Sequence, residues 1–166
     1  MNILLKTSAA VAMVAGLAAP AFGQTVSANG TGNAGIVAPL SITAGNTLEF
    51  GTVVRPAAGG SGTVTINATT GAPSYTGGVY AVSGGTAARR GTFSVLGEGT
   101  RAFTTTVGTL TLTSGGNTIP VTLTSDAPTA LTSGAATIGI GGSFTLSDTQ
   151  ATGSYTGQYS VSVAYN

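Results

Sequence analysis

Polar and apolar side chains alternate from residue 25 to residue 42, over eighteen positions. Every even position in this stretch carries glycine or an apolar residue, whereas most odd positions carry threonine, serine or asparagine. A period of two predicts an extended strand with one buried face. At roughly 3.3 Å per residue, the whole row would span about 60 Å. Because strands in globular domains usually have about 5–6 residues, one strand of one domain does not account for the row.

Short alternating runs separated by glycine-rich turns continue through the rest of the chain, and no helical period follows residue 23. This pattern is typical of an antiparallel β-sandwich or of a sheet closed on itself. A flexible low-complexity segment is the competing interpretation, but disordered chains combine low hydrophobicity with high charge, and here 42% of the residues are hydrophobic and 5% are charged. The predicted strands are 36–43, 47–54, 62–68, 78–83, 91–96, 101–107, 109–113, 118–124, 136–140, 142–147 and 154–165. The predicted turns are 57–60, 71–73, 84–85, 97–99, 114–117 and 141–142.

The first residues have the features of a secretory signal peptide. Lys6 precedes an apolar run, and Ala21-Phe22-Gly23 provides a cleavage site with small residues at both ends. The apolar run is shorter than the roughly 20 residues of a membrane-spanning helix. We therefore predict a cleaved signal peptide at residues 1–23, export through the inner membrane, and a mature chain without a stable membrane span. A retained inner-membrane anchor is the weaker alternative.

The composition excludes most kinds of reactive site. The chain has no histidine and no cysteine, which excludes Ser-His-Asp and Cys-His nucleophilic sites, CxxC redox motifs and histidine metal sites. The four carboxylates are dispersed along the chain, at Glu49, Glu98, Asp126 and Asp148. We therefore expect no catalytic residue, no cofactor-binding residue and no metal site, and we expect that the protein is not an enzyme.

The charge of the mature chain is balanced, because four arginines stand against the four carboxylates once Lys6 is removed with the leader. A net charge near zero favours association. Nucleic-acid partners usually require clustered basic residues, and Arg89-Arg90 is the only basic pair, so no nucleic-acid partner is expected. We interpret this pair as part of a solvated loop, and Asp126 and Asp148 as turn-forming residues.

The last predicted strand, in GSYTGQYSVSVAYN, has one apolar and one polar face. Its odd positions carry Tyr155, Tyr159, Val161, Val163 and Tyr165, with Gly157 among them, and its even positions from Ser154 to Ser162 are polar. Unless another strand pairs with its second side, the edge of this strand is a template for an additional strand.

Four motifs together carry a resemblance to a known family. They are LEFGTVV at 48–54, FSVLG at 93–97, GIGGSFTL at 139–146 and the segment 153–166. They resemble a secreted Gram-negative family of unknown function, similar to spore-coat-U-like proteins and to fimbrial subunits of the chaperone–usher type. Such subunits end in an alternating strand with an aromatic residue next to last and a glycine fourteenth from the end, the places of Tyr165 and Gly153 here. Many spore-coat-U-like subunits carry a disulfide, whereas this chain has no cysteine.

The resemblance implies an immunoglobulin-like sandwich over residues 34–166 that lacks its final strand. A periplasmic chaperone, and later the N-terminal extension of another copy, would supply that strand, and an outer-membrane usher would assist assembly. The result would be an extracellular head-to-tail homopolymer, a fimbria-like structure for adhesion or biofilm formation. The extension would be residues 24–33, with donor positions at Val26, Ala28, Gly30, Gly32 and Ala34. The acceptor positions would be Gly153, Tyr155, Tyr159, Val161, Val163 and Tyr165.

Two other interpretations remain open at this point. Residues from 25 onward could form an ordinary first strand of the chain's own domain behind a frayed tail. Alternatively, the protein could be a monomeric secreted or surface β-sandwich that binds carbohydrate or protein. Val26 is the only large apolar residue of the proposed extension, and burying it is worth about 1.5–3 kcal/mol. A stable donor would therefore extend to Ile36, Leu40 or Ile42, or would depend on kinetic trapping.

Overall fold

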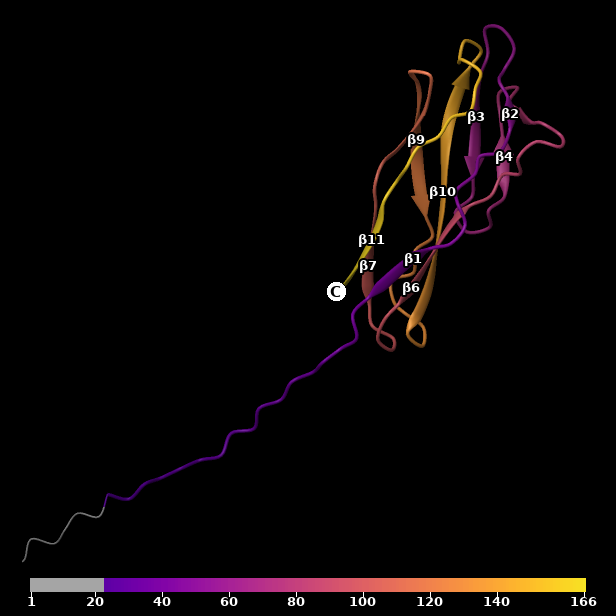
Figure 1. Cartoon of the computed structure of the whole chain (residues 1–166). Helices are drawn as coiled ribbons and strands as arrows, with labels where there is room; N and C mark the ends of the chain where they lie inside the picture. Colours follow the sequence, from indigo (N-terminus) through magenta and orange to yellow (C-terminus); the bar gives the residue numbers. More distant parts are fainter. Residues whose placement is uncertain (1–22) are drawn as a thin grey trace, which may run out of the picture. The chain divides into compact units, whose positions relative to one another are not determined.

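The alternating runs downstream of residue 40 form the antiparallel strands that their period predicts (Figure 1). The computed structural model describes residues 23–166, so the predicted signal peptide lies, apart from Gly23, outside the described residues. Residues 36–166 make up one compact unit. No described residue is helical, and the sheets pack as an all-β sandwich-like fold, which confirms the predicted fold class. Nothing within 23–166 forms a helix long and apolar enough to cross a membrane.

The strands agree with most of the predicted ranges. In chain order they are β1 (Ser41–Ala44), β2 (Val53–Val54), β3 (Ser61–Ile66), β4 (Pro73–Tyr75), β5 (Tyr80–Ala81), β6 (Gly91–Leu96), β7 (Phe103–Val107), β8 (Leu110–Ser114), β9 (Asn117–Ser125), β10 (Ala135–Ser147) and β11 (Val161–Tyr165). The main sheet has the order β1-β6-β10-β3-β4, with β9 also paired to β10 and β8 paired to β9. The remaining pairs are β11 with β7 and β2 with β5.

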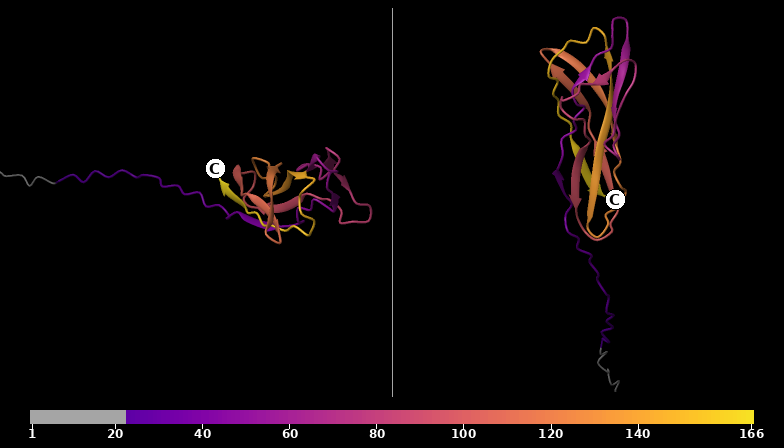
Figure 2. Two further views of the ribbon diagram at one scale, coloured as in Figure 1. Left: turned by 90° about the horizontal axis from the view of Figure 1, so that it is seen from above. Right: turned by 90° about the vertical axis from the view of Figure 1, so that its right-hand side faces the viewer.

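The 13-residue strand β10 organises the sheets (Figure 2). It pairs with β6 through Ala135–Ile140, with β9 through Ile140–Ser143 and with β3 through Gly142–Ser147. The turn predicted at 141–142 is therefore wrong, since both glycines lie inside a strand. A Cβ atom on Gly141 would collide with the carbonyl oxygen of Ile66. The glycine marks a close approach between backbones rather than a reversal of the chain.

The core is formed by the inward-facing residues of the sheets and of the segments between the strands. Val64, Ile66, Ile138 and Ile140 are fully buried on β3 and β10, and Phe103 on β7 is nearly so. Other core residues are Leu48, Phe50, Val79, Val95, Leu110, Ile119, Val121, Leu131, Phe144 and Leu146. No polar or charged residue is buried among residues 23–166, so the core of this unit consists of hydrophobic side chains.

The first strand begins later than predicted, at Ser41 instead of residue 36. Pro39 has no N–H group to donate to a ladder, and residues 23–40 have no regular secondary structure. The sequence also failed to predict β4, whose first residue, Pro73, was assigned to a turn. Proline is compatible with the first residue of a strand, so its presence did not exclude a strand there.

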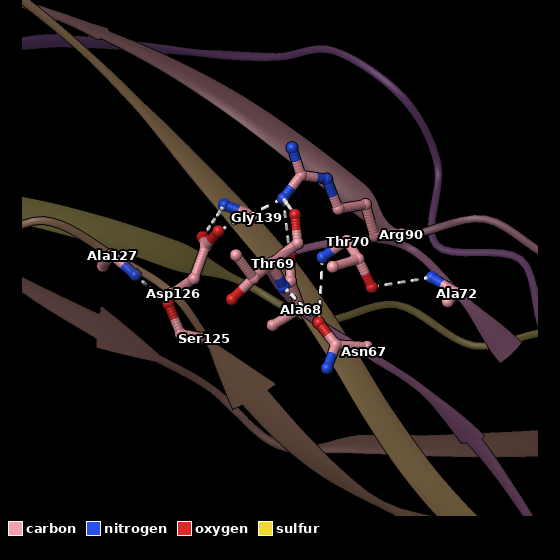
Figure 3. A network of polar contacts seen from close by, with 10 residues as sticks. All are labelled: Asn67, Ala68, Thr69, Thr70, Ala72, Arg90, Ser125, Asp126, Ala127 and Gly139. Carbon is pink, nitrogen blue, oxygen red and sulfur yellow. Dashed lines mark hydrogen bonds and ion pairs between the residues drawn. The ribbon is translucent and has the colours of Figure 1, made fainter. Parts of the chain in front are cut away.

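A polar network joins the turn after β3 to the loop after β9 (Figure 3). Arg90 Nη1 lies 3.1 Å from Asp126 Oδ2 and donates to the carbonyl oxygens of Ala68, at 2.7 Å, and Thr69. The second oxygen of Asp126 accepts from Gly139 N on β10. The interpretation of Arg89-Arg90 as a solvated loop is therefore wrong for Arg90, whose side chain is only 29% exposed.

Candidate functional site

Residues 41–54 form a long extended stretch that is paired along one side. β1 pairs with β6, Glu49 forms a bridge with Arg89, and β2 pairs with β5. These contacts align 41–54 antiparallel to residues 80–96. Within the described part of the chain, no backbone hydrogen bond joins the other side of 41–54 to any segment.

The C-terminal stretch 155–165 is also paired along one side. β11 pairs with β7, Gly108 N donates to Ser160 O at 2.8 Å, and Thr113 forms a bridge with Thr156. All these partners belong to residues 102–114. Between residues 23 and 166, the opposite side of 155–165 has no backbone hydrogen-bond partner.

Side-chain hydrogen bonds, rather than backbone ladders, link the chain at or just beyond the ends of these two stretches. At one end, Tyr165 Oη donates to Ala38 O at 3.0 Å. At the other end, Arg55 Nη1 donates to Gln150 O at 2.8 Å. The two stretches therefore run side by side in opposite directions, each with an unpaired edge. We call the region between residues 41–54 and 155–165 the seam.

A cavity of about 700 Å³ opens at the Arg55 end of the seam. Residues 48–55 line one wall and residues 150–155 line another. Its floor is formed by the core residues Ile119, Phe144 and Leu146 and by Leu112, which packs against them. Part of the core is therefore reachable from this end of the seam.

The apolar row of the last strand faces the core along the seam. Its members Tyr155, Tyr159, Val161, Val163 and Tyr165 are all partly buried against the core. The ring of Tyr159 meets Phe93 edge-on, with centroids 6.0 Å apart. Burial raises the pKa of Tyr159 above its ordinary value of 10.0. The ring of Tyr159 thus packs in the middle of the seam, whereas Tyr155 lines the open cavity at one end and the Tyr165 hydroxyl group lies at the other.

Two glycines in the predicted acceptor segment meet local steric demands. Gly153 has φ of +151°, a conformation that residues with a side chain rarely adopt. A Cβ atom on Gly157 would collide with the carbonyl oxygen of Thr111 on β8. Glycine at 157 therefore lets the last strand lie close to β8, which explains why it interrupts the apolar row.

The predicted donor positions lie in a segment without regular secondary structure. Val26, Ala28, Gly30, Gly32 and Ala34 are exposed, as is every residue from 23 to 39. Val26 is 85% exposed and Ile36 is 95% exposed. These residues therefore carry an apolar row that the chain's own described core does not use.

The chemistry of the seam is that of backbone pairing and apolar contact. Residues 23–166 contain no group of three or more acidic residues that would hold a metal ion. Asp148 Oδ2 accepts from Gly59 N at 2.6 Å and Asp126 belongs to the network around Arg90, so both carboxylates stabilise loops.

The sequence reasoning missed the residues that close the seam, namely Ala38, Arg55, Glu98 and Gln150. No local pattern singles them out, because their roles depend on contacts between distant segments.

A comparison with protein families gives a match over most of the chain. The family described as "Domain of unknown function (DUF4402)" covers residues 40–165. The chain belongs to this family. The matched range begins just before β1 and includes both stretches that form the seam. No curated protein and no solved structure matches the chain significantly.

Proposed function

We propose that this member of the DUF4402 family is the structural subunit of an extracellular fimbria-like filament. In this proposal, residues 24–33 of one copy enter the seam of another copy and add the strand that the seam lacks. The mature chain is exported, a periplasmic chaperone occupies the seam before assembly, and an outer-membrane usher passes the subunits on. The filament then serves attachment or biofilm formation, as in the fimbrial subunits that the sequence resembles.

The observation that carries the proposal is the pair of unpaired edges in the seam. A strand laid between 41–54 and 155–165 gains main-chain hydrogen bonds on both sides, and its alternate side chains face the core. Each backbone hydrogen bond adds about 1 kcal/mol net, against an ordering cost of about 1–2 kcal/mol per residue. The apolar contacts of the inserted strand must therefore supply the rest of the favourable free energy of binding. The cavity of about 700 Å³ offers a place for them.

The exposed N-terminal segment has the pattern that such an inserted strand requires. Its even row is apolar or glycine, and small residues at Ala28, Gly30, Gly32 and Ala34 suit the part of the seam where the Tyr159 ring already packs against the core. Ile36 extends the row beyond residue 33 and is exposed. Ile36 thereby adds a second large apolar side chain to the row, which otherwise has only Val26. A head-to-tail contact of this kind does not close on itself and therefore grows a filament.

The decisive experiment compares assembly of the mature chain with that of a variant lacking residues 24–33. The intact chain is expected to give SDS-resistant ladders on gels without boiling, and the deletion is expected to abolish them. Two single substitutions in the extension provide a matched pair. Ala28→Asp puts a charge on the inward row and is expected to block assembly, whereas Ser27→Asp on the outward row is expected to leave it intact.

Other results would refute strand donation. If the intact chain remains a monomer at high concentration, or if the deletion variant forms the same ladders, the proposal is wrong. A stable monomer that binds a glycan or a protein would instead support the binding-module alternative. If Ala28→Asp and Ser27→Asp have equal effects, the extension does not insert with its even row inward.

A further inference from the structure

Both backbone polar groups of Ala38 are held by residues from other parts of the fold. Its carbonyl oxygen accepts from Tyr165 Oη at 3.0 Å, and its N–H donates to Glu98 Oε2 at 3.4 Å. Glu98 N in turn donates to Tyr165 Oη at 2.7 Å. We call these three contacts among Ala38, Glu98 and Tyr165 the latch. It lies at the end of the seam opposite the cavity.

Neighbouring residues make the latch a close-packed feature. Gly97 leaves room for it, since a Cβ atom there would lie 2.7 Å from Leu40 Cδ2 and would collide with Tyr165 Oη. Pro39 follows Ala38, and a residue before proline is restricted to extended conformations. The latch therefore holds the chain extended just before β1, at the point where the N-terminal segment is joined to the folded unit.

This position matters for where the N-terminal segment can go. To enter the seam of its own subunit, that segment would have to run back alongside residues 41–54. The chain would then have to reverse direction within residues 36–40. A reversal there is incompatible with an extended Ala38 held on both sides, because the tight turn would break the contacts to Tyr165 and Glu98.

We infer that Tyr165 and Glu98 determine whether strand donation occurs between copies or within one copy. By holding Ala38, they prevent the segment from filling its own seam and leave it available to another subunit. This inference rests on the proposed function and adds a residue-level control to it. Tyr165 is a positioning residue in this role, in addition to its place in the apolar row.

The test uses Tyr165→Phe in the mature chain, which removes the hydroxyl group and keeps the ring. The share of SDS-resistant oligomers is expected to fall by about 30-fold, the factor that corresponds to loss of the two net hydrogen bonds of the Tyr165 hydroxyl group. Hydrogen exchange of the monomer fraction is expected to show new protection at residues 25–33 and lost protection at the Ala38 amide. Tyr80→Phe is the matched control, because Tyr80 is 58% exposed and lies outside the latch. It is expected to assemble like the unmodified chain.

Each possible outcome decides the matter. If the unmodified chain forms no oligomers, both the proposed function and this inference fall. If Tyr165→Phe assembles as well as the unmodified chain, the inference falls and the proposed function stands. If oligomers decrease while residues 25–33 stay unprotected in the monomer, the hydroxyl group acts in some other way and the inference also falls. Fewer oligomers together with a protected segment support it.

Discussion

Replacing Arg90 with methionine removes a guanidinium group that ties the 67–70 turn to the loop after β9. The methionine keeps most of the apolar stem and deletes the charge. The substitution removes three contacts of the guanidinium group. They join it to Asp126 at 3.1 Å, to the Ala68 carbonyl oxygen at 2.7 Å and to the Thr69 carbonyl oxygen. Asp126 then keeps its bond from Gly139 N but has no cation beside it.

The size of the effect follows from the burial of this pair. Hydrogen bonds to charged groups contribute about 1.5–3 kcal/mol each, and neutral ones about 1 kcal/mol. The side chains of Arg90 and Asp126 are 29% and 22% exposed, so solvent screens part of the attraction. We therefore expect Arg90→Met to lower the free energy of unfolding by about 2 kcal/mol. For a unit of this size, that corresponds to a decrease in Tm of about 6–10 °C.

The adjacent arginine provides the control. Arg89 Nη2 lies 3.8 Å from Glu49 Oε1, and the two side chains are 57% and 36% exposed. Exposed ion pairs of this kind contribute about 0–1 kcal/mol. We expect Arg89→Met to change Tm by no more than about 5 °C.

Thermal unfolding followed by circular dichroism measures both variants in the same buffer. Raising the salt concentration is expected to reduce the Tm shift of Arg89→Met by a larger fraction than the Tm shift of Arg90→Met, because salt screens buried ion pairs less than exposed ones. Equal shifts in Tm for the two variants would refute the reasoning that the part-buried network stabilises the fold. A shift below about 2 °C for Arg90→Met would refute it as well.

Three further predictions concern the core and the seam. Ile138→Ala, at a fully buried position, is expected to lower the free energy of unfolding by about 2–5 kcal/mol in urea titrations. Gly141→Ala is expected to give insoluble or strongly destabilised protein, because its Cβ would meet the β3 backbone, whereas Gly35→Ala, with open space around it, is expected to leave Tm unchanged in the same thermal assay. Because burial raises the pKa of Tyr159 above 10.0, the folded unit holds the phenolic proton more tightly than the unfolded chain does. Stability is therefore expected to fall as pH rises past about 10, and Tyr159→Phe is expected to reduce that slope in denaturant titrations at several pH values.

The sequence predicted the β-rich class and most strands because a period of two survives even in a chain rich in glycine. It failed where glycine and proline have more than one structural use. Gly141 and Gly142 resembled a turn, yet they allow β3 and β9 to approach β10. Pro73 resembled a turn residue, yet it begins β4. For the two glycines the deciding contact comes from a segment distant in sequence. Pro73 pairs with Ile66, only seven residues earlier, and there the same local residues fit both a turn and the start of a strand.

The candidate site was accessible from the sequence in part. The alternation of the last strand was visible, and the structure brings its tyrosines to the seam. The strands within 41–54 were predicted, but their place at the seam and the contacts that close it were not visible, since Arg55 and Ala38 become meaningful only once Gln150 and Tyr165 are placed beside them. Likewise, Arg90 and Arg89 are indistinguishable in sequence, and only burial separates their roles.

The edge strands of this fold differ in how well they are protected against pairing with another chain, and this difference bears on the function of the seam. Proteins usually protect an exposed edge by making it short or by placing proline or a charged residue on it. β5 has two residues, and β4 has three and begins with Pro73. By contrast, residues 155–165 contain no proline and no charged residue over eleven positions. A long unprotected edge next to an accessible part of the core is a liability for a protein that stays monomeric. It is compatible with a protein whose edge is always occupied, first by a chaperone strand and then by another copy, as strand donation requires.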